Sequence, residues 1–298
     1  MNAADLVASP TSPGLSAPRG GEGKGEGGAL PLGVTRHSAF RLKGPAVEPL
    51  TATIADEVPV ALVYNGLSHA VMMASPTDLE DFALGFSLSE GILDTPDDLL
   101  DLSLTRSPGG VEVAMHITAR RFAGLKDRRR SLAGRTGCGL CGVESLAEAL
   151  RDLPAIRSTL VVSRAAIDRA LAALAPLQVL NRAAGAVHAA AWADPSGAIL
   201  HLAEDVGRHN ALDKLIGRLA LSPHPPGFLV LTSRCSYELV AKAAMRDMPI
   251  LVAISAPTGL ALTVAERVGL TVVALARPDS MTVYTNPARI AELDEALR

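Results

Sequence analysis

The chain has 298 residues, of which 48% are hydrophobic, and a formal net charge of −3 at pH 7. This length predicts one large domain or two ordinary ones, and the nearly balanced charge gives no general attraction to nucleic acid. Because no charge-free apolar stretch of about 18 residues occurs, the sequence predicts no membrane-spanning helix. Three cysteines are too few for a disulfide framework and the N-terminus lacks a signal-peptide pattern, so we expect a cytoplasmic location.

Residues 1–33 are predicted to form a disordered tail. The segment is rich in Gly, Ser, Pro and Ala and has almost no large apolar side chain, so it cannot bury enough surface to offset the entropy lost on ordering. The glycine-rich run 20–28 superficially resembles a phosphate-binding loop. We exclude that interpretation because no strand precedes the run and no helix follows it.

Residues 34–135 are expected to form a smaller, β-rich N-terminal subdomain. The predicted strands are 51–54, 59–64, 67–74 and 111–117. Asn65-Gly66, between two of these strands, is typical of a hairpin turn. A helix is predicted over 79–90, because residues 75–78 carry a helix start signal and apolar side chains then recur on one face.

Cys138 and Cys141 form a Cys-x-x-Cys pair in the glycine-rich segment 136–142, which we expect to be a mobile loop. A helix predicted over 143–153 would point its partially positive N-terminus at this pair, and four arginines precede the pair. Each of these features lowers the pKa of a thiol and so favours the reactive thiolate. The pair therefore indicates sulfur or redox chemistry.

Three other interpretations of this cysteine pair stay open. A structural zinc site needs four ligands, so His188, His201 or His209 would have to fold beside the pair, because Cys235 is single and distant. A thioredoxin-like exchange site needs a preceding apolar strand, whereas an arginine-rich segment stands there. The third is an idle, reduced pair, against which the glycine-rich surroundings argue.

Residues 143–298 are expected to form an α/β domain. Apolar strands alternate with helices of about 8–12 residues, which predicts a largely parallel sheet that is buried on both faces. The predicted strands are 198–203, 228–232, 250–255 and 270–276. The predicted helices are 167–175, 208–219, 237–245 and 260–268, and the small residues of 186–192 predict a further helix start.

Polar loops follow successive strands of this predicted sheet, over residues 204–214, 232–242, 255–259 and 277–287. In open α/β sheets ligands bind beyond the carboxyl ends of the strands, so these loops are expected to converge on one site. Helix N-terminal amides together with Arg234 and Ser236 would suit a phosphate, and the ligand is expected to be large and phosphate-bearing. The alternative is a set of ordinary charged loops, in which Asp205 only caps a helix. Cys235 has no cysteine nearby and is expected to be structural or a bystander.

A series of ordered motifs runs along residues 40–295. They are Asn65-Gly66, Asp81-Phe82-Ala83-Leu84-Gly85-Phe86, Ser89-Glu90-Gly91, the Cys-Gly-x-Cys-Gly loop, Glu204-Asp205-Val206-Gly207-Arg208-His209-Asn210-Ala211, Ser233-Arg234-x-Ser236 with Glu238, Ala256-Pro257-Thr258 and Tyr284-Thr285. Together these motifs resemble the formate dehydrogenase accessory sulfurtransferase family, often called FdhD or NarQ.

The resemblance implies an activity in sulfur transfer. A cysteine desulfurase would pass persulfide sulfur to Cys138, and Cys141 would help to release or relay it. The protein would deliver this sulfur to the molybdenum cofactor, bis-molybdopterin guanine dinucleotide, which formate dehydrogenase then requires. The resemblance also implies a homodimer and a cytidine-deaminase-like α/β fold, in which a mixed sheet with flanking helices accompanies the smaller N-terminal β-rich subdomain.

The cofactor site implied by the resemblance includes Met281, Thr282, Val283, Tyr284, Thr285 and Asn286, and the strand-end loops add His209, Asn210, Arg234, Ser236 and Lys242. Deaminase chemistry is excluded, because it needs His-x-Glu and Pro-Cys-x-x-Cys and this chain has His188-Ala189-Ala190 and Arg234-Cys235-Ser236-Tyr237 instead. We therefore expect no metal of the protein's own. A second hypothesis is a chaperone that binds the cofactor or the apo-enzyme without transferring sulfur.

Overall fold

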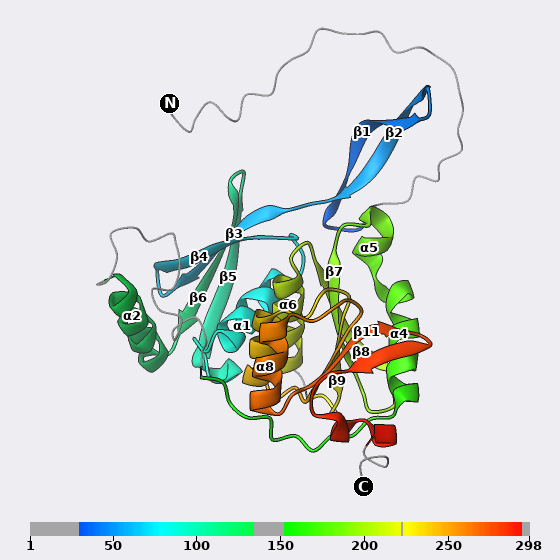
Figure 1. Cartoon of the computed structure of the whole chain (residues 1–298). Helices are drawn as coiled ribbons and strands as arrows, with labels where there is room; N and C mark the ends of the chain where they lie inside the picture. The colour runs from blue at the N-terminus through cyan, green and yellow to red at the C-terminus, as the bar shows by residue number, and fades with distance from the viewer. Residues whose placement is uncertain (1–29, 134–151, 222, 294–298) are drawn as a thin grey trace. The chain divides into compact units, whose positions relative to one another are not determined.

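The computed structural model describes residues 30–133, 152–221 and 223–293, and these form three sheets with flanking helices (Figure 1). The predicted tail therefore lies almost wholly outside the described residues. The predicted cysteine loop over 136–142 and nearly all of the helix predicted over 143–153 lie outside them as well.

The first sheet is a two-stranded antiparallel ribbon of β1 (Val34–Lys43) and β2 (Ala46–Ala55). Its side chains are largely exposed, and Phe40 and Leu42 near the turn are 73% and 75% exposed. At its base, Val34 packs in a small buried cluster with Leu180 and Val187. The sequence predicted only part of β2, because a ribbon with so little buried surface lacks a strong apolar alternation.

The second sheet has four strands in the order β4-β3-β6-β5. Its strands are β3 (Val58–Tyr64), β4 (Leu67–Ala74), β5 (Leu99–Ser107) and β6 (Gly110–Ile117). Asn65 and Gly66, with φ of 46° and 80°, form the predicted turn between β3 and β4. The predictions for β3, β4 and β6 are confirmed, whereas β5 was missed. A short 3-10 turn, η2 (Pro96–Asp98), leads into β5, and the arginine-rich segment after β6 begins as helix α2 (Ala119–Ala133).

The third sheet has six strands in the order β12-β11-β10-β9-β7-β8. Its strands are β7 (His188–Ala193), β8 (Ile199–Asp205), β9 (Phe228–Leu231), β10 (Ile250–Ala253), β11 (Thr271–Arg277) and β12 (Ser280–Val283). Parallel pairs join only β9, β10 and β11, whereas β7, β8 and β12 pair antiparallel with their neighbours. The mixed α/β fold is confirmed, and the expectation of a largely parallel sheet is wrong.

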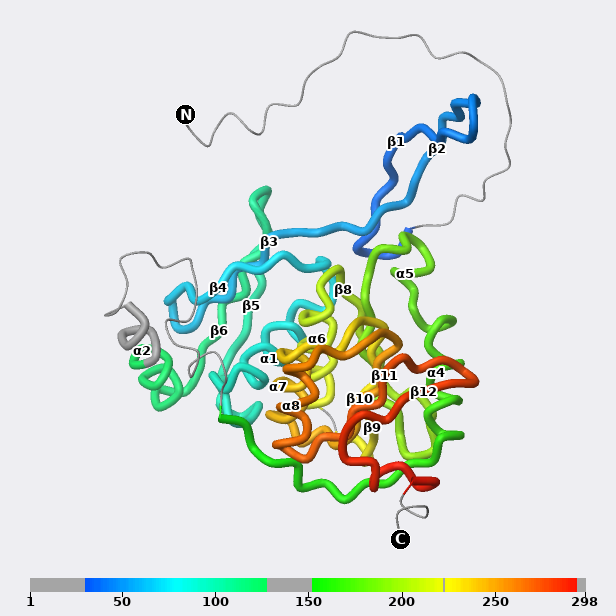
Figure 2. Tube along the Cα trace, viewed as in Figure 1, coloured from blue at the N-terminus to red at the C-terminus, as the bar shows by residue number. Residues whose placement is uncertain are grey.

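Helices cover both faces of this sheet (Figure 2). Besides α2, the described residues form the helices α1 (Leu79–Ser89), α4 (Arg164–Leu177), α5 (Val179–Ala184), α6 (Arg208–Ala220), α7 (Tyr237–Met245) and α8 (Gly259–Val268), and the short 3-10 turn η3 (Pro287–Arg289). One buried cluster joins α6, α7 and α8 to one face of the sheet and continues through α1 to the four-stranded sheet. A second buried cluster packs α4 against the opposite face.

The helix start predicted over 186–192 is wrong, because these residues form β7. The run Ala189–Ala191 is buried between β8 and β9, and its side chains alternate between the two faces of the sheet. Alanine has the highest intrinsic helix propensity, but that preference is worth little against the pairing and burial of a central strand.

Two glycines let α1 and α6 cross at very close range. A Cβ atom at Gly85 would overlap the backbone carbonyl of Asp213, and one at Gly217 would overlap the backbone carbonyl of Asp81. No side chain larger than hydrogen fits at either position without moving the helices apart. This crossing connects the four-stranded sheet to the six-stranded sheet, and so it positions the loops described next.

Candidate functional site

The carboxyl ends of the parallel strands converge with the N-termini of three helices at one edge of the six-stranded sheet. Backbone hydrogen bonds connect the loop after β9 to the loop after β10, from Cys235 N to the Ala256 carbonyl at 3.2 Å and from Thr258 N to the Cys235 carbonyl at 2.9 Å. Helices α6, α7 and α8 begin at this edge, and helix N-termini attract anions. We call it the carboxyl edge.

His209 lies at the carboxyl edge between two neighbouring polar groups. Its Nε2 lies 3.4 Å from Ser236 Oγ and 3.7 Å from Glu238 Oε2. Burial, reinforced by the positive charge of Arg208, lowers the pKa of His209 to about 4. The same two causes lower the pKa of nearby His188. Both imidazoles are therefore neutral at pH 7, and each can accept a hydrogen bond from a ligand or donate one to it.

Arg208, the first residue of α6, is the residue of this site that the sequence analysis did not single out. Its Nε is buried and has no hydrogen-bond partner among the described residues. A buried N–H of a cation without a partner is costly, so this guanidinium is suited to an anionic ligand. The sequence signal that could have identified Arg208 is its position directly after Gly207, within the motif at 204–211.

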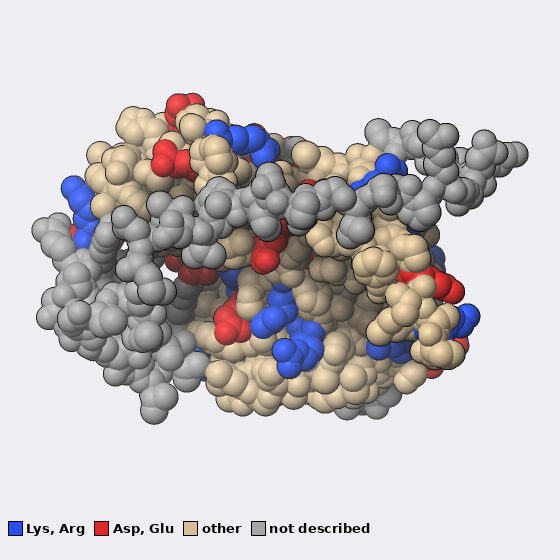
Figure 3. Space-filling view, turned by 90° about the horizontal axis from the view of Figure 1, so that it is seen from above, with Lys and Arg blue, Asp and Glu red and all other residues tan. Residues whose placement is uncertain are grey.

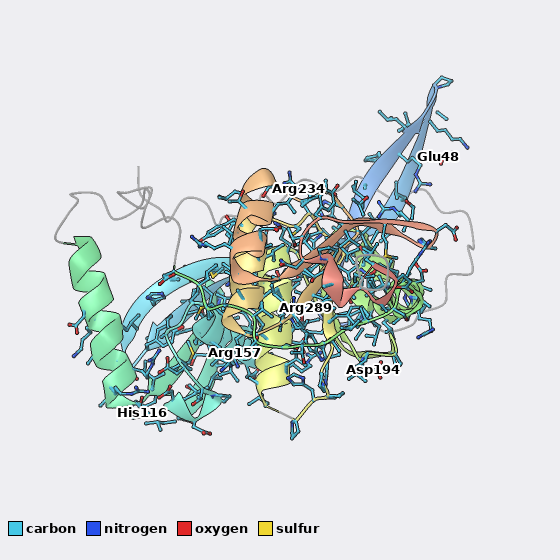
Figure 4. The ribbon with its side chains drawn as sticks, turned by 60° about the horizontal axis from the view of Figure 1, so that its bottom comes forward. Glu48, His116, Arg157, Asp194, Arg234 and Arg289 are labelled. Atoms are coloured by element: carbon cyan, nitrogen blue, oxygen red, sulfur yellow. The ribbon has the colours of Figure 1, made fainter. Side chains whose placement is uncertain are left out.

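Arg234 adds a second positive charge at the carboxyl edge, and it is exposed. The bridge between its neighbour Cys235 and Pro257 places it near the start of α8, where Figure 4 labels it. Figure 3, which views the molecule from above, shows Lys and Arg side chains gathered near the middle of that face beside a few acidic ones. Arg277 is not free in the same way, because its guanidinium donates to the carbonyls of Ile254 and Ala276.

Lys242 and Asn210, both expected in the cofactor site, make internal contacts instead. Lys242 Nζ lies 2.9 Å from Asp213 Oδ1 and donates to Ser89 and Glu90, at the end of α1, at the same distance. Asn210 Nδ2 donates to the Met73 carbonyl at 2.8 Å and to Asp205 at 3.0 Å. The structure does not bring either side chain to the exposed part of the carboxyl edge.

Most polar residues of the 204–214 motif likewise hold the fold together. Asp205 forms a fully buried ion pair with Lys214 at 2.7 Å and accepts a hydrogen bond from the backbone N–H of Ser75 at 2.9 Å. The carboxylate of Glu204 accepts hydrogen bonds from the backbone N–H groups of Leu180 and Asn181, which open α5. These carboxylates therefore fix the positions of chain segments and are not available to a ligand.

The segment Met281–Asn286 runs from the carboxyl edge to the opposite edge of the sheet. β12 pairs antiparallel with β11, so its last residues lie beside the start of β11. There Thr285 Oγ1 and Asn286 Nδ2 donate to the carbonyl of Leu270 at 2.7 Å and 2.9 Å. The structure thus places Tyr284, Thr285 and Asn286 at the opposite edge of the sheet from His209, Arg234 and Ser236.

Cys138 and Cys141 lie outside the described residues. The third cysteine, Cys235, is fully buried, and burial raises the pKa of its thiol to about 12. A thiol that stays protonated is a poor nucleophile, so Cys235 is structural. No group of three His, Cys, Asp or Glu side chains within the described residues is arranged to hold a metal ion. In the same part of the chain, no helix is long and apolar enough to cross a membrane.

Comparison with known proteins identifies the family. The model of the FdhD/NarQ family matches residues 55–291. The chain belongs to the FdhD/NarQ family. A relative in Variovorax paradoxus (strain S110) named "Sulfur carrier protein FdhD" is 51% identical over 239 residues, which are 80% of this chain and 86% of that protein.

A solved structure from Desulfotalea psychrophila, described as a formate dehydrogenase accessory protein, has the same fold as this FdhD/NarQ chain. The two superpose with a TM-score of 0.69 over 87% of this chain and 100% of the other, at 23% sequence identity. The FdhD/NarQ match includes every described residue of the carboxyl edge, and it excludes β1 and nearly all of β2.

Proposed function

We propose that this FdhD/NarQ protein is a cytoplasmic sulfur carrier that takes persulfide sulfur from a cysteine desulfurase and transfers it to bis-molybdopterin guanine dinucleotide, for use by formate dehydrogenase. The observation that carries the proposal is the 51% identity to a protein named as a sulfur carrier, in a chain that has its own Cys-x-x-Cys pair. We propose that the protein works as a homodimer.

The two cysteines have complementary roles in the proposed reaction. The Cys138 thiolate attacks the outer sulfur of the donor's persulfide, so that a new S–S bond forms on Cys138 and the donor leaves as its thiolate. Attack of the Cys141 thiolate on Cys138 Sγ then releases the outer sulfur as sulfide to the cofactor. The oxidation of the two cysteines to the Cys138–Cys141 disulfide supplies the two electrons that reduce the outer sulfur to sulfide, and a cellular reductant restores the dithiol.

The carboxyl edge supplies partners for the phosphates of the cofactor. Arg208, with its unpartnered Nε, and the exposed Arg234 carry the positive charge, and charge-assisted hydrogen bonds from Arg to phosphate are strong. His209 and Ser236 lie beside them. Of the eleven residues expected to bind the cofactor, this arrangement favours Arg234, Ser236 and His209.

Intact-mass spectrometry tests the sulfur-carrier proposal directly. After incubation with a cysteine desulfurase and cysteine, without reductant, the protein should gain about 32 Da per added sulfur, and reduction should remove it. Cys138→Ala should gain nothing, while Cys235→Ala serves as the matched control and should gain sulfur as the natural chain does.

The second candidate is a chaperone that binds the cofactor and transfers no sulfur. It is favoured by one observation, the unpartnered Arg208 at the carboxyl edge, which suits an anion whether or not sulfur moves. A protein that gains no mass beside an active desulfurase, and whose Cys138→Ala/Cys141→Ala variant still supports formate dehydrogenase activity, would establish this candidate in place of the first.

A further inference from the structure

A cleft of about 360 Å³ opens at the edge of the six-stranded sheet opposite the carboxyl edge. It lies where β9 and β10 begin and where α6 ends, because Gly227 and Pro249 line it directly before those two strands. Ile216, Leu219 and Met248 give it apolar walls. Small-molecule sites are commonly clefts of about this size with a few polar groups placed among apolar ones.

The aromatic wall of the cleft is the indole of Trp192. Its Nε1 donates to the Pro225 carbonyl at 3.3 Å, and the ring of His224 meets it edge-on, with centroids 5.5 Å apart. A Cβ atom at Gly227 would lie only 2.7 Å from the indole nitrogen. The indole is thus held in place from three sides. Trp192 is only 4% exposed, so a small part of its ring lines the cleft.

Arg246 brings an unbalanced positive charge into this cleft. Among the described residues, none accepts a hydrogen bond from its guanidinium, and burial lowers its pKa. The neighbouring carboxylate of Asp247 is engaged elsewhere: Oδ1 accepts from the backbone N–H of Arg157 at 2.7 Å, and Oδ2 lies 3.7 Å from Arg157 Nε. Arg246 is half-buried, and a guanidinium without a carboxylate partner can form charge-assisted hydrogen bonds to an anion in the cleft.

A second cation strengthens the positive potential of this edge. Arg289 donates to the carbonyls of Ser158 and Gly269 at 2.9 Å, and its Nε is buried without a partner among the described residues. Ser158 itself lines the cleft. Figure 4 labels Arg157 and Arg289, which both belong to this edge.

The geometry points to a binding site for a small aromatic anion, with the ring of the ligand between the apolar walls, beside the accessible part of Trp192, and its carboxylate or phosphate paired with Arg246. This site is separate from the one proposed for the cofactor, because it lies at the opposite end of the strands. An anionic group would complete the hydrogen bonding of the Arg246 guanidinium, while the apolar walls would exclude water from the ring of the ligand.

The experiment uses 2-naphthoate as the probe and 2-naphthamide as its neutral counterpart of nearly the same shape. Trp192 is the only tryptophan of the chain, so the full-length ¹⁵N-labelled protein gives one indole N–H signal, which needs no further assignment. We expect 2-naphthoate to shift this signal saturably and to bind at least about tenfold more tightly than 2-naphthamide, because only the anion pairs with Arg246.

Two variants make the test specific. Arg246→Gln should reduce the affinity for 2-naphthoate to that for 2-naphthamide, whereas Arg157→Gln should change it less than about twofold, because that side chain is 85% exposed at the same edge. Thermal unfolding checks that each variant is folded. Absence of a saturable shift, equal affinities for the two probes, or equal losses in the two variants would overturn the inference. None of these results bears on the persulfide experiment.

Discussion

Arg208 and His209 are adjacent in the chain and give the carboxyl edge one charged and one neutral side chain. Arg208 brings a positive charge to the site, and burial of His209, reinforced by that charge, keeps its imidazole in the neutral form. A phosphate-binding site benefits from this arrangement, because the neutral imidazole can bind as donor or acceptor while the guanidinium supplies the attraction.

The lowered pKa of His209 predicts a loss of stability in acid. The unfolded chain takes up a proton on His209 near pH 6.5, whereas the folded chain does so only near pH 4. Between these values the unfolded state binds more protons, so stability falls as the pH falls. His209→Gln should therefore lose less stability between pH 7 and pH 5 than the natural chain, as measured by urea unfolding.

The control for this prediction removes an exposed imidazole from the other sheet. His116 lies on β6 and is exposed, so His116→Gln should unfold with the same pH dependence as the natural chain. If His209→Gln also behaved like the natural chain, His209 would not be held neutral in the way that its surroundings indicate.

At the scale of elements, the crossing of α1 and α6 determines where the carboxyl edge lies relative to the four-stranded sheet. Gly85 and Gly217 each meet a backbone carbonyl of the opposite helix. Backbone atoms cannot rotate away as a side chain can, so the two helices would have to separate to admit a methyl group.

Gly217→Ala is expected to destabilise the protein by about 1–3 kcal/mol or more, which is typical of overpacking a rigid interface. Gly124 is the matched control, because it lies within helix α2 and a Cβ atom there would meet nothing within 4 Å. Gly124→Ala should be neutral or should stabilise the protein by up to about 1 kcal/mol. Chemical denaturation measures both, and equal effects would show that the helices do not pack as described.

At the scale of the whole molecule, buried ion pairs connect the four-stranded sheet and α1 to the six-stranded sheet. Lys242 of α7 pairs with Asp213 of α6 and reaches Ser89 and Glu90 at the end of α1. Burial raises the pKa of Asp213, although Lys242 and Ser89 act against that rise. Pairs of this kind are costly to break, because the remaining charge is left buried alone.

Lys242→Met is expected to destabilise the protein by about 3–5 kcal/mol. The variant should also lose more stability at pH 8 than at pH 5. Its folded Asp213 holds a proton more tightly than the unfolded chain does, so stability falls as the pH rises above the unfolded pKa. Urea unfolding at the two pH values measures this. The double variant Lys242→Met/Asp213→Asn should recover part of the loss and show little pH dependence.

A different outcome would support a role for Lys242 in binding the cofactor. If Lys242→Met kept the stability of the natural chain at both pH values and lost only the binding of the molybdenum cofactor, its contact with Asp213 would be incidental. The ligand role expected from the sequence would then hold.

Local sequence patterns were enough to predict the elements whose periodicity is strong. β4 and α7 begin and end at the predicted residues. The apolar side chains of α7 face the main core, whereas β4 adds only Met72 and Ala74 to it and is marked in the sequence by the Asn65-Gly66 turn before it. The strand β7 was predicted as a helix, since an alanine run carries a local helical preference that only the neighbouring strands override. β1 and β5 were missed because much of each strand is exposed and shows little apolar alternation.

The sequence by itself determined the family, the presence of a Cys-x-x-Cys pair and the strand-end position of the polar loops, because each of these depends on residues close together in the chain. Only the tertiary structure decided which of the polar residues can reach a ligand. Lys242 and Asn210 are paired with segments more than 130 residues away, and the turn into β12 carries Tyr284–Asn286 to the opposite edge. Such pairings stabilise buried charge only after the chain has folded, so a local pattern does not reveal them.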